Sequence, residues 1–388
     1  MFKHLSRTVA LLCSGLCAPL AMADINGGGS TLAQPLYQTA GVLTTGFAPY
    51  IGVGSGAGKV AFLNNDYSKF VDGVTRNVHW AASDSKLRPV ELNAYAFAHG
   101  AAWGPLIQVP SAATSIAIPF NKAGVAGIDL SVNQLCGVFS GRLTDWSQIN
   151  GSGRTGPITV VYRAESSGTT ELFTRFLRAK CAETGSFSVT THFASSYSGG
   201  PPARALAAVH SEGAMYAMNA TQGAITYMSP AYAASTLAGL DDATKVARVA
   251  GVSPAPANIS AAIAAIAVPA TGNRSNPNAW VPVFGATTDT FDPSVVPFPT
   301  TGYPILGFTN VIFSQCYADI GQSAQVRTFF VRHYNASSAV NHDAAISANR
   351  LLPLPVAWKA AIRNSFLTAA DTLSIGNPNV CNGIGRPL

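Results

Sequence analysis

The chain has 388 residues, of which 48% are hydrophobic and 11% are charged, and its formal net charge is +6. This length is sufficient for two domains, each with its own hydrophobic core. The basic residues are scattered and form no run, so the positive charge favours small anions as partners and argues against a nucleic-acid-binding protein.

Residues 1–23 have the pattern of a secretory signal peptide. Lys3 and Arg7 precede an apolar run that ends in Ala21-Met22-Ala23, a small-x-small cleavage motif. Cleavage after Ala23 removes 23 of the 388 residues, leaving 365, and lowers the net charge from +6 to +4. No later segment is a long uninterrupted apolar run. We therefore expect an exported protein, periplasmic or secreted, without a membrane span.

Four cysteines follow the predicted cleavage site: Cys136, Cys181, Cys316 and Cys381. An even number of cysteines in an exported chain favours disulfides, and the sequence alone allows three pairings. Their spacing does not suggest a metal site. We expect no metal and no cofactor.

The first two predicted strand-to-helix turns are rich in glycine. A short strand at 24–26 leads into a turn at Gly27-Gly28-Gly29 and a helix that Ser30 or Thr31 could cap. The second strand, at 50–53, leads into a glycine-rich turn that contains Ser55. Either turn could serve only to connect a strand to a helix, but its backbone N–H groups could also hold an anion.

The second turn is close to the phosphate-binding loop of NTPases but departs from it at two positions. Val53 replaces the first glycine, and Val60 replaces the Ser or Thr that would bind magnesium after Lys59. The nucleotide-binding interpretation is therefore rejected.

The next two turns add charged residues. The strand at 79–82 is followed by Ser83-Asp84-Ser85, and the strand at 160–163 ends at Arg163 before Ser166-Ser167-Gly168-Thr169 opens a helix. A helix start presents unpaired N–H groups, and an arginine supplies a planar fork of donors for an oxyanion. The alternative is two ordinary helix caps with Arg163 on the surface. Because ligands of open α/β sheets bind where the carboxyl ends of strands converge, the four turns together predict one anion site.

The remaining segments complete an α/β pattern. Extended segments are predicted at 107–120 and 303–313, and helices at 131–139, at 323–334 and around 358–366. Residues 184–205 and 251–302 are rich in Gly, Pro, Ser, Thr or Asn and are predicted to be long surface loops.

These motifs resemble those of the DING proteins, a branch of the periplasmic phosphate-binding (PstS-like) superfamily. Asp24-Ile25-Asn26-Gly27 stands at the predicted mature terminus, and the resemblance continues through GVGSGAG, ASDSKL, LCGVFSGRLTDW, YRAESSGTTELFTRFL and the four cysteines. It covers essentially all of residues 24–388. Motifs of this length and order are far more specific than any single short pattern.

The resemblance implies an α/β, two-lobed periplasmic-binding-protein type II fold with two hinge crossovers. Lobe 1 would contain residues 24–118 and 306–388, and lobe 2 residues 119–305. This division favours the disulfides Cys136–Cys181 and Cys316–Cys381, each within one lobe.

The resemblance also implies a ligand set for phosphate. It comprises Thr31, Leu32, Ser55 and Asp84 of lobe 1 and Arg163, Ser167, Gly168 and Thr169 of lobe 2. Leu32 enters this set through the resemblance alone. A carboxylate beside a bound anion must accept a hydrogen bond; protonated phosphate can donate one and sulfate cannot. Asp84 therefore predicts selection of phosphate over sulfate.

The leading functional hypothesis is a monomeric receptor that clamps inorganic phosphate between its lobes, with an ABC-type phosphate permease as a candidate partner. The alternative is a phosphatase that uses the same phosphate site, since some DING relatives are described as phosphatases. The sequence contains no dense carboxylate and histidine cluster for two metals and no base assigned beside a serine, so no catalytic residue is named.

Overall fold

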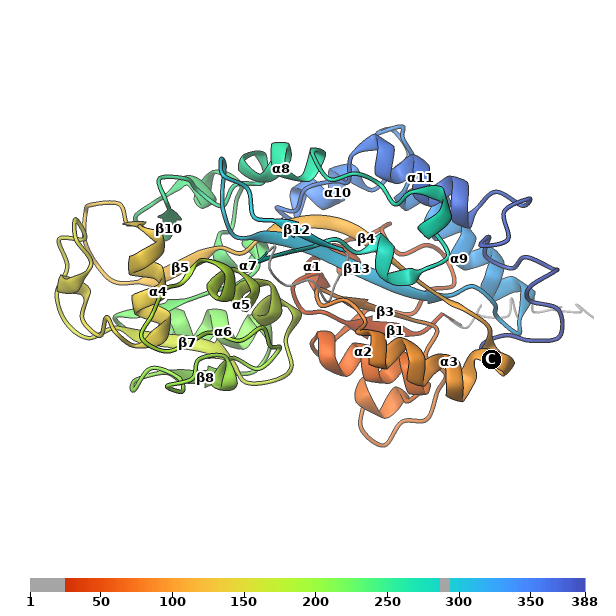
Figure 1. Cartoon of the computed structure of the whole chain (residues 1–388), viewed down its shortest axis with the longest axis horizontal. Coiled ribbons are helices and arrows are strands. Elements are labelled where there is room, and N and C mark those ends of the chain that lie inside the picture. The colour runs from red at the N-terminus through yellow and green to blue at the C-terminus, as the bar shows by residue number, and fades with distance from the viewer. Residues whose placement is uncertain (1–24, 287–293, 388) are drawn as a thin grey trace, which may run out of the picture.

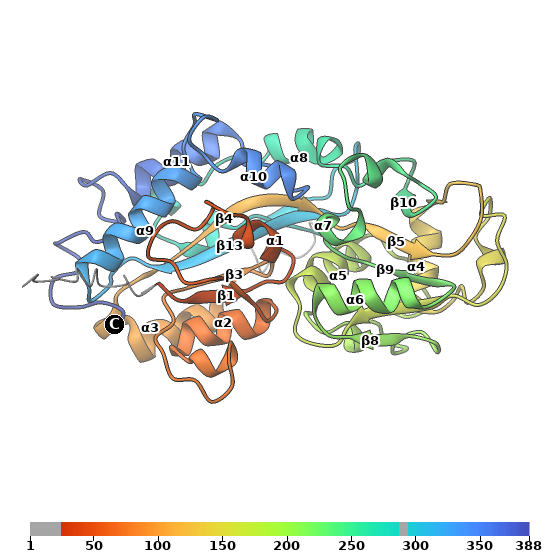
Figure 2. The same cartoon turned by 180° about the vertical axis from the view of Figure 1, so that it is seen from behind.

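The computed structural model describes residues 25–286 and 294–387, which form an elongated molecule with one β-sheet in each half (Figure 1; Figure 2). The predicted signal peptide, its cleavage site and Asp24 lie outside the described residues. Within the described ranges, no helix is long and apolar enough to cross a membrane.

The first sheet has five strands in the order β2-β1-β3-β13-β4. Strands β1, β2 and β3 are parallel, so their carboxyl ends lie at one edge, and β13 is antiparallel to β3 and β4. Helices α2 and α3 lie on one side of this half and α9, α10 and α11 on the other (Figure 1). The strands are β1 (Gly27–Gly29), β2 (Ile51–Gly52), β3 (Trp80–Ser83), β4 (Leu106–Ser115) and β13 (Leu306–Ser314); the helices are α1 (Gln34–Gln38), α2 (Ser55–Asn64), α3 (Pro89–Trp103), α9 (Ile320–His333), α10 (Asp343–Ala348) and α11 (Val356–Phe366).

The second sheet has six strands in the order β6-β10-β5-β9-β7-β8. Strand β7 is parallel to both β8 and β9, so the carboxyl ends of these three strands also share an edge. The strands are β5 (Ile118–Asn121), β6 (Asp129–Leu130), β7 (Thr159–Arg163), β8 (Leu206–Ala208), β9 (Ala224–Thr226) and β10 (Val246–Val249); the helices are α4 (Val132–Ser140), α5 (Gly168–Lys180), α6 (His210–Ala220) and α7 (Pro230–Ala233).

The chain passes between the two sheets twice. Strand β4 ends at Ser115 and β5 begins in the other sheet at Ile118, and the chain returns to the first sheet as β13. The long strands β4 and β13 are paired along their whole length, with Leu106 opposite Ser314 at one end and Ser115 opposite Leu306 at the other. The two-lobed α/β fold with two crossovers is thus confirmed, while the bounds of the lobes stay a prediction.

The glycines at the start of the mature chain form a strand. A turn was predicted at Gly27–Gly29, and this prediction is wrong because these residues are β1, paired on both sides with β2 and β3. A Cβ on Gly27 would overlap the Trp80 indole, and one on Gly28 would overlap the backbone of Ile51. Glycine therefore permits the close packing around β1.

The prediction of a long surface loop at 251–302 is also wrong. Within its described part lie α8 (Ser260–Ala264), β11 (Val283–Gly285) and β12 (Val295–Pro297), and the last two pair with each other. Trp280 is 1% exposed and packs against Phe366 of α11 with a ring-centroid distance of 5.0 Å. Both these short elements and the burial of large side chains such as Trp280 therefore order this segment. Residues 184–205 form a loop with one 3-10 turn, as predicted.

Two disulfides join the predicted partners. Cys136 of α4 is bonded to Cys181, which follows α5, and Cys316 is bonded to Cys381 near the end of the chain.

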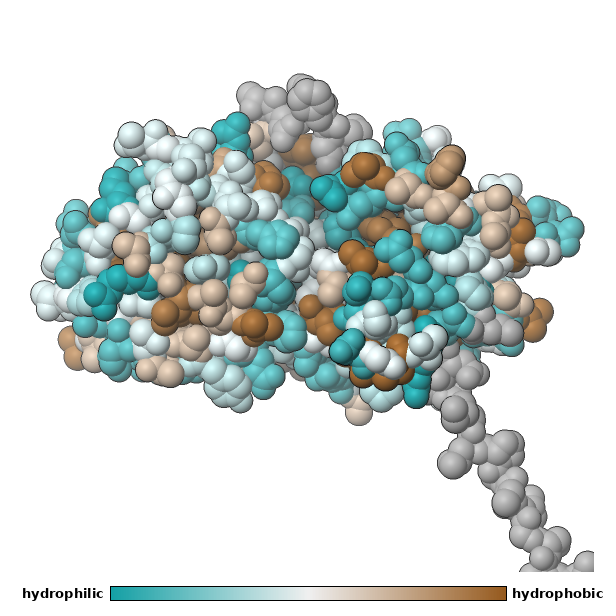
Figure 3. Space-filling view, turned by 90° about the horizontal axis from the view of Figure 1, so that it is seen from below, coloured by the Kyte–Doolittle hydropathy of each residue, from teal (hydrophilic) through white to brown (hydrophobic). Residues whose placement is uncertain are grey.

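Seen from below, the surface mixes polar and apolar residues, and neither kind forms a continuous band (Figure 3).

Candidate functional site

The carboxyl ends of β1, β2 and β3 bring hydroxyl groups around one buried carboxylate. Asp84, which follows β3, is 4% exposed. The Ser30 hydroxyl donates to its Oδ1 at 2.7 Å, and the Ser55 hydroxyl donates to its Oδ2 at 3.4 Å. The backbone N–H of Asp84 donates to Ser55 Oγ at 3.1 Å. This half of the site is therefore a carboxylate held within hydrogen-bonding distance of two serines.

Burial controls the electrostatics of Asp84. Desolvation raises the pKa of this carboxyl, against the smaller lowering effects of Ser30, Thr309, Arg163 and Ser55. Burial thus disfavours the charged form even though neighbouring hydroxyls donate to it. A further donor directed at Asp84 would stabilise it.

The second sheet contributes an arginine from the end of β7. Arg163 is 2% exposed; its Nη1 donates to Ser211 Oγ at 3.1 Å and its Nη2 to Thr31 Oγ1 at 2.9 Å. Glu165 forms an ion pair with the same guanidinium. The Nε of Arg163 is buried and has no hydrogen-bond partner among the described residues. Such a donor normally has an acceptor, and an oxyanion could supply one.

The turn after β7 caps α5 as the sequence predicts. Ser167 is the N-cap, and its Oγ accepts from the backbone N–H of Thr170 at 3.3 Å. The Thr170 hydroxyl lies 2.7 Å from the hydroxyl of Tyr227, which also accepts from the backbone N–H of Arg163 at 3.3 Å. Tyr227 thereby ties the end of β7 to the first turn of α5.

The two halves are in direct contact at the site. The hydroxyls of Thr31 and Ser211 lie 2.8 Å apart, and the Thr169 hydroxyl donates to Asp84 Oδ2 at 3.5 Å. Gly168 lies so close to the first sheet that a Cβ on it would be 2.5 Å from Ser55 Oγ and 2.7 Å from Asp84 Cβ. The lobes are therefore closed on one another here.

The predicted site residues meet in one place. Six of them make the contacts described above, and Ser167 caps the helix that begins with Gly168 and Thr169. Leu32 lies next to them, because its backbone N–H donates at 3.1 Å to the Ser30 hydroxyl that donates to Asp84. We call this group the cage; it comprises Thr31, Leu32, Ser55, Asp84, Arg163, Ser167, Gly168 and Thr169. Their roles as ligands are part of the function proposed below.

Three residues next to the cage belong to the site in the structure but were not predicted from the sequence to do so. Ser30 was considered only as a helix cap, although its hydroxyl both donates to Asp84 and accepts from the backbone N–H of Leu32 at 3.1 Å. Glu165 was not given a role. Ser211 follows β8 at the start of α6, which is a fifth strand-to-helix turn. That position after a strand was the available signal, but β8 is only three residues long and two of them are exposed.

The residues of the cage suit a small oxyanion. They supply one cation, several hydroxyls, a helix start and one carboxylate that can accept a hydrogen bond. In the part of the chain that the structure describes, there is no group of three or more His, Cys, Asp and Glu residues that could hold a metal ion.

Comparison with known proteins agrees with the fold. Residues 19–330 match the model of a family described as the PBP superfamily domain. The chain belongs to this superfamily. A solved structure of a DING protein is 64% identical, with a TM-score of 0.90, covering 94% of this chain and 100% of the other, which places the chain in the DING branch.

Two other relatives carry different functional names. A high-affinity periplasmic phosphate-binding protein, solved with phosphate bound, is 68% identical, with a TM-score of 0.91, covering 94% of this DING chain and 100% of the other. A protein named Alkaline phosphatase L from Pseudomonas aeruginosa strain UCBPP-PA14 is 65% identical over the full length of both chains.

Proposed function

We propose that this DING protein is a periplasmic or secreted receptor that binds inorganic phosphate in the cage between its two lobes. The observation that carries the proposal is the buried Arg163, whose Nε has no hydrogen-bond partner among the described residues while its other nitrogens contact hydroxyls from both lobes. The 68% identical relative solved with phosphate supports the same ligand.

The cage residues have complementary roles in the proposal. Arg163 would balance the charge of the anion, and the hydroxyls of Thr31, Ser55, Ser167 and Thr169 and the N–H groups at Leu32, Gly168 and Thr169 would donate to its oxygens. Asp84 would accept a hydrogen bond from a protonated phosphate oxygen. Sulfate has no such proton, so it would leave two acceptors facing each other in a dry site, at a cost of several kcal/mol.

A phosphatase role has less support in the geometry. The hydroxyls of Thr31, Ser55 and Thr169 contact Arg163 or Asp84, and among the described residues none of them is hydrogen-bonded to a histidine that could act as its base. The close contact between lobes also leaves little space for the organic part of a phosphomonoester. We therefore propose a monomeric receptor that delivers phosphate to an ABC-type permease, after export and cleavage of the signal peptide behind Ala23.

The test is calorimetric titration of the phosphate-stripped mature protein with phosphate and then with sulfate, followed by a phosphomonoester turnover assay on the same sample. We expect one phosphate per chain, no comparable sulfate binding and no turnover. Arg163→Ala should weaken phosphate binding by at least tenfold, because a charge-assisted contact is lost in a buried site. Phosphate affinity unaltered by Arg163→Ala would move the site elsewhere, and turnover that the variant loses would establish the phosphatase.

A further inference from the structure

Thr309 carries a buried hydroxyl for which the cage offers a use. It lies in β13, the strand on which the chain returns to the first sheet, and it is 0% exposed. Its Oγ1 has no hydrogen-bond partner among the described residues. Buried polar groups in folded proteins are nearly always hydrogen-bonded, so a hydroxyl in this position requires an explanation.

The strand register places Thr309 beside Asp84. In the antiparallel pairing of β13 with β3, Asn310 lies opposite Ser83, and Thr309 and Asp84 are the next residues along the two strands. Asn310 fixes this arrangement, because its Nδ2 donates to the carbonyl of Ser83 at 3.1 Å. The Thr309 hydroxyl is also one of the groups that lower the pKa of Asp84, as a nearby donor does.

The other hydroxyls around Asp84 hold its two oxygens unequally. Ser30 donates to Oδ1 at 2.7 Å, whereas the hydroxyls of Ser55 and Thr169 lie 3.4 and 3.5 Å from Oδ2. Hydrogen bonds between a hydroxyl and an oxygen are usually shorter than the last two. A further donor would therefore restrict the orientation of the carboxylate.

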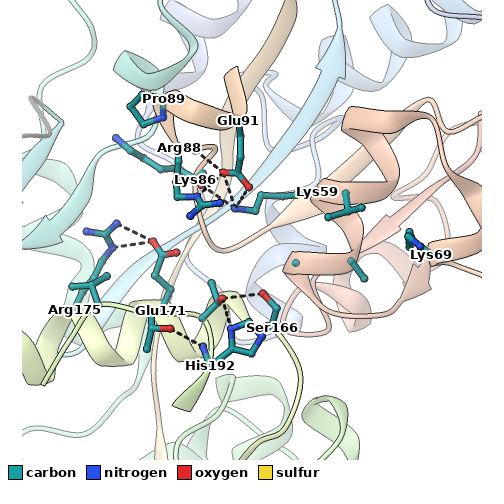
Figure 4. A pocket seen from close by; sticks show the side chains of 16 residues that line it. Lys59, Lys69, Lys86, Arg88, Pro89, Glu91, Ser166, Glu171, Arg175 and His192 are labelled. Carbon is teal, nitrogen blue, oxygen red and sulfur yellow. Dashed lines mark hydrogen bonds and ion pairs between the residues drawn. The ribbon is translucent and has the colours of Figure 1, made fainter. Parts of the chain in front are cut away.

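Asp84 does not open onto the large cavity beside the cage. That cavity has a volume of about 710 Å³ and is lined by ion pairs such as that of Glu171 with Arg175 (Figure 4). At its edge, the backbone N–H of Gly56 donates to the carbonyl of Ser166 at 3.1 Å, and Asp84 is not among the lining residues. Since Asp84 is 4% exposed, its donors must come from the protein or from a bound ligand.

We propose that Thr309 is a positioning residue for phosphate recognition: when phosphate is bound, its hydroxyl donates to Asp84 and holds the carboxylate ionised and oriented to accept the proton of phosphate. This inference rests on the proposed function of the cage. Strand β13 also touches the other lobe, because a Cβ on Gly307 would lie 2.5 Å from Cδ2 of Leu172 in α5. The strand that carries Thr309 therefore contacts both halves of the site when the lobes are closed.

Four other charged or titratable side chains act on Asp84. Arg163, at the end of β7, forms an ion pair with Glu165. Tyr37 of α1 and Tyr50, which directly precedes β2, approach Asp84 from the first lobe. Burial raises the pKa of both tyrosines, so both stay neutral around pH 7. The hydroxyl of Thr309 adds no charge to this set.

The probe is sulfate, which keeps both charges and has no proton to donate between about pH 5 and 8.5, whereas a protonated Asp84 could donate to it. Phosphate and then sulfate are titrated calorimetrically into the phosphate-stripped mature protein over this range. The same titrations are run on Thr309→Val, which keeps the branched shape without the hydroxyl, and on Thr309→Ser, which keeps the hydroxyl. Thr309→Ala serves if Thr309→Val does not fold.

We expect sulfate binding to begin about 0.5 to 1 pH unit higher in Thr309→Val than in the wild type, because loss of a donor to the charged form favours protonation of Asp84. At a pH within this interval, the ratio of phosphate to sulfate affinity should fall about three- to tenfold in Thr309→Val. Thr309→Ser should follow the wild-type profile.

An unshifted profile in Thr309→Val, no sulfate binding by this variant at any pH tested, or an equal shift in Thr309→Ser would each overturn the proposal. Weaker binding of both anions at every pH without a shift would make Thr309 a direct ligand and would also overturn the positioning role. Failure of the proposed receptor function would appear in the phosphate titrations of the wild type and Arg163→Ala. Failure of this inference would appear only in the Thr309 variants, so the two are distinguishable.

Discussion

Gly168→Ala tests the closure of the lobes without removing any donor of the cage. Its added Cβ would lie 2.5 Å from Ser55 Oγ, 2.7 Å from Asp84 Cβ and 2.8 Å from the backbone nitrogen of Ser85, all across the seam between the lobes. Contacts this short require the lobes to separate slightly or α5 to shift. The backbone N–H of residue 168 is retained, so any loss of affinity reports on packing alone.

Overpacking by one methyl group in a close-packed site costs about 1 to 3 kcal/mol. Since every 1.4 kcal/mol is a factor of ten, the dissociation constant for phosphate should rise about 5- to 150-fold. The free energy of unfolding without phosphate should not fall by a comparable amount, because an open form relieves the clash. Calorimetric titration and denaturant unfolding of the same sample measure the two effects.

Gly213→Ala is the matched control, because Gly213 is also a helical glycine and a Cβ on it would meet no atom within 4 Å. It should leave phosphate affinity unchanged and stabilise α6 by up to about 1 kcal/mol. If Gly168→Ala bound phosphate as tightly as this control, the contact of α5 with Ser55 and Asp84 would not belong to the phosphate-bound form.

Three other changes test separate parts of the structure. Asp84→Asn should reduce the preference for phosphate over sulfate at least tenfold in competition titrations, and unchanged selectivity would remove Asp84 from the ligand set. Burial and the neighbouring His342 lower the pKa of His333 to about 3, so His333 stays neutral in the folded protein, whereas an unfolded histidine gains a proton below about pH 6.5. The free energy of unfolding should therefore fall by about 1.4 kcal/mol for each pH unit below that point. In urea unfolding, His333→Gln should lose about 2 kcal/mol less of this free energy than the wild type between pH 7.5 and 5.0, and equal losses would contradict the prediction. Replacing Cys136 and Cys181 by serine removes a disulfide between residues 45 positions apart, and it should lower the free energy of unfolding by about 2 to 4 kcal/mol. A change below about 1 kcal/mol would show that the disulfide restrains the unfolded chain little.

Local chemistry explains which parts of the site could be predicted from sequence. The segment from Val160 to Thr169 carries a strand, a polar turn and a helix cap within ten residues, and the structure contains all three. Asp84 was found by the same logic, because its position after a strand depends only on nearby residues. Such local signals predicted the turns and one anion site between them, and the family resemblance supplied the individual ligands.

The features that were missed depend on distant partners. Gly27 belongs to a strand because Trp80, 53 residues later, packs against its face. Ser211 joins the site because its hydroxyl lies 2.8 Å from that of Thr31, which belongs to the other lobe. Trp280 is ordered by Phe366. No pattern within one segment contains these contacts, so only the folded chain reveals them.

The burial of Arg163 predicts how the phosphate affinity of the cage responds to salt. Arg163 is 2% exposed inside the cage. Mobile ions screen exposed charges over about 8 Å at physiological ionic strength but reach a buried pair much less. The equilibrium affinity of the cage for phosphate, measured by calorimetric titration, should thus change little between about 50 and 300 mM salt. An affinity that falls steeply with salt would mean that Arg163 is solvated when phosphate binds, contrary to the closed arrangement of the lobes.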